Sequence, residues 1–244
     1  MTLSVAERLI VAADFKPDEE YGVSGARKKV LALATKLERT GVTLKVNSVL
    51  RACGYTLIDQ IHECRLRVFA DLKLYDIGET LSTDGMFLRY HKPELLTVAT
   101  ATGEAAMRSL KLELPHTEVL GVTVLTTFTD EDSLAMFTCT TEEAVYRFAD
   151  LAQAAGLDGL ISSPKEATAL SSRYEHLFTI NTPAIRPEWS VVEGDDQNPA
   201  RVMTPEKALR AGATRIVVGR PITQSPDPYA AVMRTLDEMA KVVS

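Results

Sequence analysis

The chain alternates between short apolar or β-branched runs and longer amphipathic stretches, and this alternation constrains its fold more than any other feature. Eight such runs begin about every 30 residues, the length of one strand-plus-helix unit. Repeated strand and helix signals of this kind are typical of a parallel sheet covered by helices. In 244 residues without an internal linker, they predict an α/β fold, a single-domain (β/α)₈ or TIM barrel over residues 1–244. The runs are residues 9–15, 42–47, 66–73, 95–101, 119–127, 157–163, 177–185 and 215–220.

Helix signals lie between these runs. Three times a capping residue precedes a proline, the arrangement typical of a first helical turn. Two pairs of residues also have capping-box spacing, and three glycines follow helical patterns, where a left-handed residue often ends a helix. The proline pairs are Ser163-Pro164, Thr204-Pro205 and Asp227-Pro228, the capping boxes are Ser163 with Glu166 and Thr140 with Glu143, and the glycines are Gly41, Gly156 and Gly212.

An open, doubly wound parallel sheet is the alternative architecture. No G-x-G-x-x-G sequence follows the first apolar run, and this favours the barrel. One long connection, at about residues 186–203, carries no clear strand or helix pattern and is rich in Glu, Asp, Gly and Asn. Connections of this length are often lids over a binding site, so an active-site lid is predicted there.

The composition and residue patterns argue against several classes of function. The formal net charge is −6, from 27 Lys and Arg against 33 Asp and Glu, so there is no basic excess for binding nucleic acid or an anionic membrane. No apolar stretch reaches the roughly 18 residues needed to cross a bilayer, and residues 1–7 lack a secretory pattern, which predicts a cytoplasmic protein. The 3 cysteines and 4 histidines lack metal-ligand or catalytic spacing and predict neither disulfides nor a metal site.

Charged residues mark the ends of the first three predicted strands, where barrels of this type carry their catalytic groups. Asp14 ends the first strand, Lys45 lies on the second, and Asp71 and Lys73 end the third, followed by Asp76. Asp71 and Lys73 are two residues apart, so their side chains project to the same face, which is the barrel interior if the alternating apolar positions face the helices. The cluster predicts either a charged catalytic network or a salt bridge that closes the barrel mouth.

Arginines follow the seventh and eighth predicted strands, whose loops often hold phosphate in barrel enzymes. Arg186 follows the seventh strand, and Gly219 with Arg220 ends the eighth. A guanidinium group binds phosphate through two parallel hydrogen bonds, and a glycine lets backbone N–H groups approach closely. Gln197, inside the predicted lid, is placed to close over such a ligand. The alternative for Arg220 is a simple surface charge.

With these residues in place, the sequence resembles the orotidine 5′-phosphate decarboxylase family, (β/α)₈ enzymes of pyrimidine biosynthesis. Residues 71–80, DLKLYDIGET, resemble the family's D-x-K-x-x-D-I-x-x-T signature. The resemblance spans the chain and implies a carboxy-lyase that converts orotidine 5′-phosphate to uridine 5′-phosphate without a cofactor or metal. The other matching segments are Asp14, Lys45, LTT at 125–127, TPAIRP at 182–187, DDQ at 195–197, RVMTP at 201–205 and VGRPIT at 218–223.

The resemblance also implies a role for each matching residue. Lys73 is implied as the proton donor to C6 of the pyrimidine ring. Asp76, Ile77 and Thr80 are implied to reach into the neighbouring subunit's site, which implies a homodimer. The remaining implied positions are Lys45, Asp71 and Asp76 in the charged network, Asp14 and Lys45 at the ribose, Asp71 near the departing carboxylate, Thr126 or Thr127 at the pyrimidine, and Arg186, Gln197, Gly219 and Arg220 at the phosphate.

Three positions depart from the family pattern: Asn47 where glycine is frequent, Ala99 where histidine is frequent, and an additional aromatic residue, Trp189, in the predicted lid. Two other functions remain as alternatives. A sugar-phosphate decarboxylase or aldolase of the same superfamily shares the D-x-K-x-x-D core but uses Mg²⁺, and Lys45 disfavours a cation near the second strand. A phosphate-binding barrel without activity would not need the charged set at 71–76.

Overall fold

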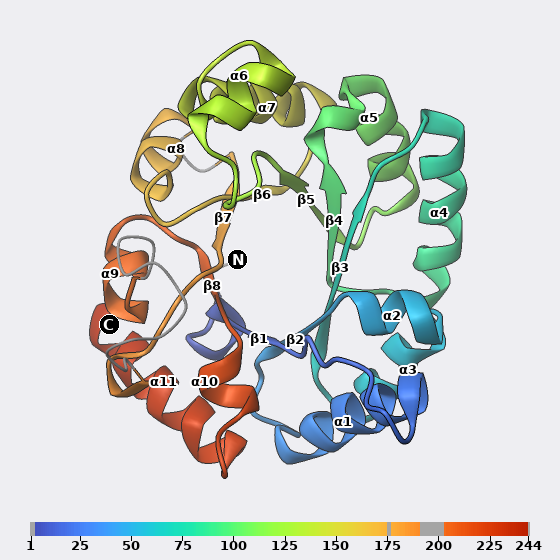
Figure 1. Cartoon of the computed structure of the whole chain (residues 1–244), viewed down its shortest axis with the longest axis vertical. Coiled ribbons are helices and arrows are strands. Elements are labelled where there is room, and N and C mark those ends of the chain that lie inside the picture. The colour runs from blue at the N-terminus through green and yellow to red at the C-terminus, as the bar shows by residue number, and fades with distance from the viewer. Residues whose placement is uncertain (1–2, 175–176, 191–202, 244) are drawn as a thin grey trace.

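The computed structural model describes residues 3–174, 177–190 and 203–243 of the chain. Its eight strands, all parallel, form one closed barrel in sequence order, and helices surround this barrel on the outside (Figure 1). The predicted (β/α)₈ barrel is therefore confirmed. The strands are β1 Leu9–Ala12, β2 Thr43–Val46, β3 Arg67–Leu74, β4 Leu95–Ala99, β5 Glu118–Val122, β6 Gly159–Ile161, β7 Thr179–Thr182 and β8 Arg215–Val218.

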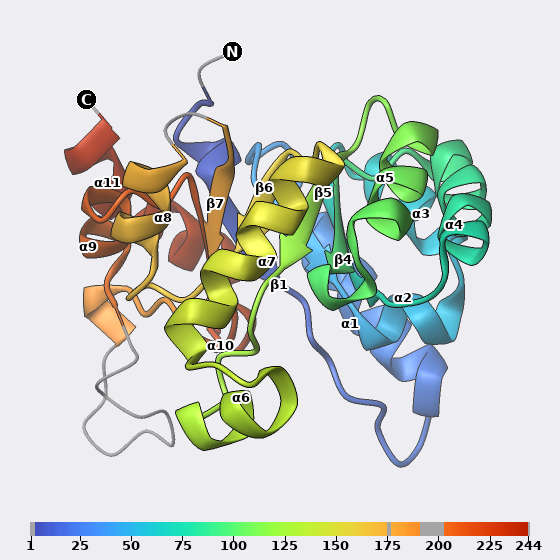
Figure 2. The ribbon, with the colours of Figure 1, turned by 90° about the horizontal axis from the view of Figure 1, so that it is seen from above.

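Helical segments follow each strand, and several connections hold more than one helix. After β5, the short α6 projects beyond the barrel before α7 runs back along its wall (Figure 2). None of the helices in the described ranges combines the length and the apolar character that a bilayer crossing requires. The helices are η1 Ala6–Arg8, α1 Gly22–Lys36, α2 Ser48–Cys53, α3 Thr56–Glu63, α4 Gly78–His91, η2 Thr100–Thr102, α5 Glu104–Glu113, α6 Asp130–Phe137, α7 Thr141–Ala155, α8 Ala167–Arg173, η3 Glu188–Ser190, α9 Pro205–Arg210, α10 Arg220–Thr223 and α11 Pro228–Val243.

The alternation of side chains along the strands divides the apolar core into two parts. On β3, Val68, Ala70 and Leu72 pack outward in the large core between the barrel and its helices. Phe69, of opposite parity, points inward, and Asp71 shares its face. The predicted inward orientation of Asp71 is therefore confirmed. The inner apolar cluster is Ile10, Ala12, Phe69, Leu95, Leu120 and Val217.

Most of the helix signals found in the sequence act as predicted. The capping box before α7 is complete, because the Thr140 side chain accepts from the Glu143 N–H and the Glu143 side chain accepts from the Thr140 N–H. Thr204 caps α9 with proline in the first turn, and the Asp227 side chain accepts the Ala230 N–H at 3.0 Å at the start of α11. These side chains satisfy amide groups that have no partner within the helix.

Two of the predicted helix boundaries are wrong. No helix starts at Ser163-Pro164: the Glu166 N–H donates to the Ser163 backbone carbonyl at 3.1 Å, which makes a turn, and α8 begins only at Ala167. One hydrogen bond of the predicted capping box does form, because the Ser163 N–H donates to the Glu166 carboxylate at 2.9 Å. Gly41 does have a left-handed φ of 78°, but α1 ends earlier, at Lys36. In both cases a turn separates the helix from the residue that resembles its cap.

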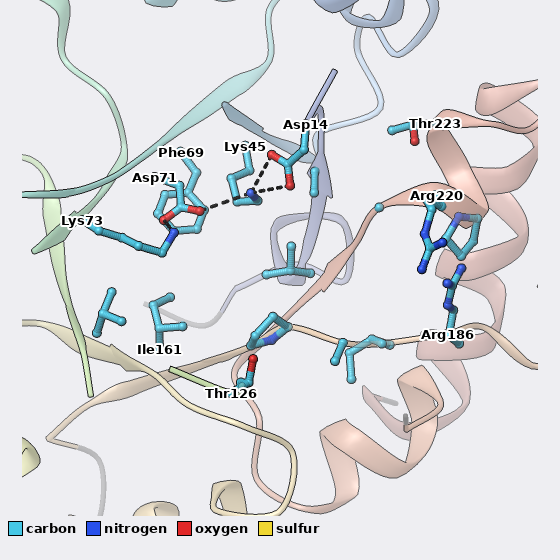
Figure 3. A pocket seen from close by; sticks show the side chains of 18 of the residues that line it. Asp14, Lys45, Phe69, Asp71, Lys73, Thr126, Ile161, Arg186, Arg220 and Thr223 are labelled. Atoms are coloured by element: carbon cyan, nitrogen blue, oxygen red, sulfur yellow. Dashed lines mark hydrogen bonds and ion pairs between the residues drawn. The ribbon is translucent and has the colours of Figure 1, made fainter. Parts of the chain in front are cut away.

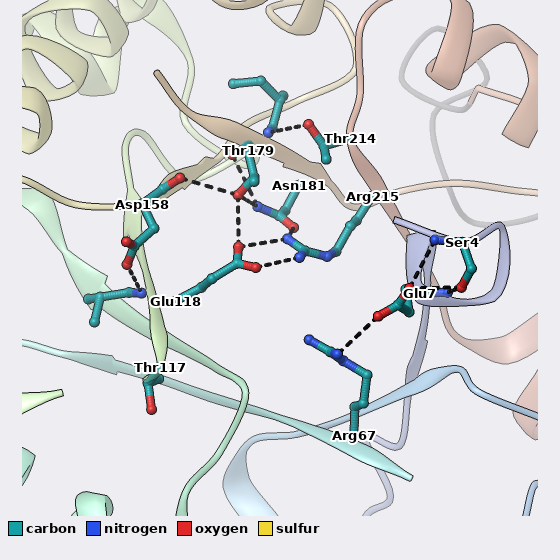
Figure 4. Close-up of polar contacts among 12 residues, drawn as sticks. Ser4, Glu7, Arg67, Thr117, Glu118, Asp158, Thr179, Asn181, Thr214 and Arg215 are labelled. Atoms are coloured by element: carbon teal, nitrogen blue, oxygen red, sulfur yellow. Dashed lines mark hydrogen bonds and ion pairs between the residues drawn. The ribbon is translucent and has the colours of Figure 1, made fainter. Parts of the chain in front are cut away.

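Buried charges close the end of the barrel where the strands begin (Figure 4). Arg215, which is 1% exposed, donates to both carboxylate oxygens of Glu118, at 2.6 and 2.9 Å, and to Asn181 Oδ1 at 3.3 Å. Arg67 and Glu7 form a second ion pair at 3.1 Å on the same end. Each of these charged side chains has a partner of opposite charge, so the buried Arg215 is not left uncompensated. The opposite end is left for the site.

Candidate active site

A cavity of about 850 Å³ opens where the strands end. Residues on β1, β2, β3, β5, β6, β7 and β8, or in the loops after them, line it. Its lining combines apolar side chains, including Phe69, Val122, Ile161 and Val217, with charged ones. Figure 3 shows the charged groups gathered at two sides of the cavity. An apolar pocket with a few convergent polar groups is the usual form of a small-molecule site.

One wall of the cavity carries four charges of alternating sign (Figure 3). The Lys45 ammonium group donates to Asp14 at 2.8 and 3.0 Å and to Asp71 Oδ2 at 3.2 Å. The Lys73 ammonium group donates to the other oxygen of Asp71, Oδ1, at 2.7 Å. Lys45 and Asp71 are both buried, with 7% of each residue exposed, so each needs the opposite charge beside it.

The electrostatics of this row keep Asp71 ionised. Burial by itself would raise the pKa of the Asp71 carboxyl group. The positive charges of Lys45 and Lys73, with hydrogen bonds from Lys73 and Thr97, outweigh burial and lower this pKa below its ordinary value. Of the predicted network, Lys45, Asp71 and Lys73 meet within one chain and line the cavity, whereas Asp76 is not among the described lining residues.

The backbone at Lys73 departs from regular strand geometry. Its φ is 47°, in the left-handed region, which costs about 1–2 kcal/mol for a residue with a side chain. The register between β3 and β4 also shifts between Ala70 and Leu74, as at a β-bulge. Such bulges redirect side chains and are frequent beside active sites.

Two arginines lie across the cavity from Lys73, at the ends of β7 and β8 (Figure 3). Arg186 is buried, with 8% exposed, and Arg220 opens α10 directly after Gly219. A Cβ on Gly219 would meet the Ala12 Cβ at an ordinary 3.7 Å, so neighbouring atoms leave room for a side chain there. The pair of guanidinium groups is suited to an anionic group such as phosphate.

Some of the predicted site residues lie elsewhere in the single chain. Thr126 lines the cavity, whereas Thr127 is exposed and is not among the described residues that line it. Ile77 is 70% exposed on the loop after β3, where its N–H donates to the Asp76 carboxylate at 2.8 Å, and Thr80 lies on α4. Gln197, and residues 191–202 of the predicted lid, lie outside the described residues.

The three positions that depart from the family pattern are not among the described residues that line the cavity. Asn47 caps α2 through its side chain, which accepts the Ser48 N–H at 2.5 Å. Ala99 ends β4 at the start of η2. Trp189 lies against α11, with the Arg234 guanidinium group 5.1 Å from its ring centre, and it is not among the described lining residues of the cavity.

Sequence reasoning missed several residues of the site. Phe69 and Ile161, two of the apolar lining residues, have the inward parity of their strands, and Phe69 could have been found from its position two residues before Asp71. Thr97, a fully buried polar residue on β4, contacts Asp71 and Lys73. Its only sequence signal is a threonine inside an apolar run. Among the described residues, no group of three or more His, Cys, Asp or Glu is arranged to hold a metal ion.

A closed barrel with an ionic row and an arginine pair at the carboxyl ends of its strands has the form of a barrel enzyme that acts on a small anionic molecule. Residues 7–235 match the model of the orotidine 5′-phosphate decarboxylase / HUMPS family. The chain belongs to this family.

Individual relatives agree with this assignment. An orotidine 5′-phosphate decarboxylase from Saccharophagus degradans is 35% identical over 240 residues, which cover 96% of this chain and 95% of that protein. One from Staphylococcus aureus is 41% identical over 182 residues, 72% of this chain and 77% of that protein. The crystal structure of the enzyme from Lactobacillus acidophilus superposes with a TM-score of 0.78 at 29% identity, covering 96% of this chain and 99% of that one.

Proposed function

We propose that this chain decarboxylates orotidine 5′-phosphate to uridine 5′-phosphate, a step of pyrimidine biosynthesis. The observation that carries the proposal is the placement of the Lys73 ammonium group beside Asp71 on one wall of the cavity, with Arg186 and Arg220 on the other (Figure 3). A nucleotide has its reactive ring and its phosphate at opposite ends, so this separation of charges fits such a substrate. We also propose a cytoplasmic location, as the sequence predicts.

In the proposed reaction, Lys73 stabilises the charge that develops at C6. The bond from C6 to the carboxylate carbon breaks, its electron pair stays on C6, and CO₂ leaves. This pair lies in the ring plane, where the ring's π-system does not delocalise it, so a nearby cation lowers the barrier. A proton then passes from the Lys73 ammonium group to C6, and the amine regains a proton from water. In this step the positive charge beside C6 comes from Lys73, and no cofactor or metal takes part.

The remaining cavity residues are proposed to hold the substrate. Arg186 and Arg220, with the backbone at Gly219, bind the phosphate, and Asp14 with Lys45 binds the ribose hydroxyl groups. Thr126, the one of the two candidate threonines that lines the cavity, faces the pyrimidine. Binding energy from the phosphate end can then position the ring against Lys73. Gln197 is proposed to join the phosphate contacts.

A homodimer is proposed as the active form, with Asp76, Ile77 and Thr80 contributing to the neighbouring subunit's site. The segment that carries them exposes large apolar side chains: Ile77 is 70% exposed and Tyr90 on α4 is 77% exposed. Exposed apolar groups on one segment are typical of an interface between subunits. Burial and the negative charge of Asp76 both raise the pKa of Asp84 on α4, so the two carboxyl groups repel each other within the chain.

The test is direct. The purified chain is mixed with orotidine 5′-phosphate, and loss of its absorbance and release of CO₂ are followed together. We expect turnover that EDTA does not change, and a loss of at least about a thousandfold in kcat for Lys73→Ala, because proton donation and charge stabilisation are removed together. Lys36→Ala, which removes an exposed ammonium group at the end of α1, is the control and keeps wild-type turnover. Near-wild-type turnover in Lys73→Ala, or loss of turnover with EDTA, would contradict the mechanism.

A further inference from the structure

The amide group of Lys73 has an unusual partner. Its N–H donates to the side-chain hydroxyl of Thr97 on β4, at 2.9 Å, at the point where the register between β3 and β4 shifts. A left-handed backbone at a residue with a side chain persists only where its surroundings hold it in place. Thr97, which is fully buried, supplies one such restraint from the neighbouring strand.

The same hydroxyl also holds the carboxylate that pairs with Lys73. Thr97 Oγ1 lies 3.0 Å from Asp71 Oδ1. Because an amide N–H can only donate, the hydroxyl accepts from Lys73 and its single proton is directed to Asp71. Asp71 Oδ1 in turn accepts from the Lys73 ammonium group at 2.7 Å. Thr97 therefore closes a ring of hydrogen bonds that includes both the backbone and the side chain of Lys73.

The turn around Lys73 is held from other elements as well. Arg51 on α2 donates to the carbonyl of Leu72, and Thr102 on η2 donates to the carbonyl of Asp76. These contacts fix the path of the chain before and after Lys73. Thr97 differs from both because it alone of the three also bonds to Asp71 in the described structure.

We propose that Thr97 is a positioning residue that sets where the Lys73 ammonium group lies over the substrate. This proposal rests on the decarboxylation proposed above. Thr97 is not among the described residues that line the cavity, so it acts through Lys73 and Asp71 and not on the substrate. Removing its hydroxyl leaves the Lys73 N–H and one acceptor site of Asp71 without this partner, and it releases the ammonium group from its fixed position.

Thr97→Val and Thr97→Ser separate the hydroxyl from the shape of the side chain. We expect kcat to fall about 10- to 100-fold in Thr97→Val, because small displacements of a catalytic group have effects of this size, while KM changes less than about threefold. Thr97→Ser keeps the hydroxyl and stays within about threefold of wild type in kcat. Thr117→Val is the matched control: this buried hydroxyl donates to the Pro93 carbonyl at 2.8 Å at the other end of the barrel (Figure 4), and its loss leaves kcat unchanged.

The pH profile is a readout that a packing role would not change. The charged groups that face Asp71 are Lys45 from β2 and Lys73 from β3, with Asp14 behind Lys45. They remain in Thr97→Val, which loses only the hydrogen bond that favours the ionised carboxyl. The pKa of Asp71 therefore rises, and the acidic limb of the kcat/KM profile moves to higher pH. Thr97→Ser and Thr117→Val keep the wild-type profile.

The outcomes are distinct. Unchanged kcat and an unchanged pH profile in folded Thr97→Val overturn the proposal, as does an equal loss of kcat in Thr97→Ser. If Thr97→Val does not fold, Thr97→Ala is compared with Thr97→Ser under the same criteria. If the wild-type chain does not turn over orotidine 5′-phosphate, the proposed function fails, and the positioning role is then tested by NMR titration of the Asp71 carboxyl in wild type and variants, where an unchanged pKa overturns it.

Discussion

At the scale of single residues, buried charges occupy both ends of the barrel interior and have different roles at each. Asp71 lies between two lysines where the strands finish, and its ionisation is maintained for the cavity beside it. Arg215 lies at the other end, paired with Glu118 through both of its terminal nitrogens, and it is not among the described residues that line the cavity. Removing one partner of a buried pair leaves the other charge without compensation.

Glu118→Gln tests this distinction. The variant leaves Arg215 buried against a neutral amide, and we expect the free energy of unfolding to fall by about 3 kcal/mol, measured by urea denaturation. Its kcat for orotidine 5′-phosphate stays at the wild-type value, because the change is at the end of the barrel away from the cavity. Glu104→Gln removes the exposed partner of Arg108 on α5 and changes stability by less than about 0.5 kcal/mol. Equal effects of the two substitutions would show that burial does not decide the strength of these pairs.

At the scale of elements, the connection after β5 depends on local caps. Complete capping boxes open both α6 and α7, at Thr129 and Thr140. The backbone and hydroxyl of Thr141 bond to the Asp130 carboxylate, at 2.9 and 2.6 Å, which joins the two helix starts. These contacts are close in sequence, so they form wherever this segment becomes helical, and they were predictable at Thr140.

Thr140→Ala is expected to lower the free energy of unfolding by about 1 kcal/mol, because the amide of the first turn loses its side-chain acceptor. Thermal and urea denaturation both measure this change. Thr140→Ser keeps the hydroxyl and remains within about 0.3 kcal/mol of wild type. A loss as large in Thr140→Ser as in Thr140→Ala would assign the effect to the methyl group of threonine and not to the cap.

At the scale of the whole molecule, a single chain brings together most of the proposed site but not Asp76. Lys45, Asp71 and Lys73 meet in the cavity, whereas the Asp76 carboxylate caps the amide of Ile77 on an exposed loop. If the homodimer places Asp76 in a partner's cavity, two different inactive chains can restore each other.

Mixing Lys73→Ala with Asp76→Asn tests this arrangement. Each variant alone is expected to be inactive. Refolding them together in equal amounts makes half of the dimers mixed, and one of the two sites in each mixed dimer has Lys73 from one chain and Asp76 from the other. Activity should therefore recover to about a quarter of the wild-type value per site. No recovery above the separate variants, although a mixed dimer forms, would place Asp76 and Lys73 in the same chain's site.

The amino-acid sequence by itself determined the barrel and one half of the ionic row. Strand and helix periods are local properties of the chain, so eight runs, the caps at Thr140 and Thr204, and the shared face of Asp71 and Lys73 could be predicted. The proline pair at Ser163 failed because a backbone turn competes there with the predicted helix start. Ser163-Pro164 and Thr204-Pro205 look alike in sequence, and the hydrogen bonds of the folded segment decide that only Thr204 begins a helix.

Only the tertiary structure decided which residues meet across strands. Lys45 reaches Asp71 because the β2–β3 register pairs Lys45 with Phe69, and no local signal encodes such a register. The same holds for Thr97, which is 26 residues from Asp71 and joins it only after β4 pairs with β3. Closing the barrel adds the constraint that fixes all the registers together. For this reason the sequence predicts which residues face the interior, and the closed barrel decides which of them touch.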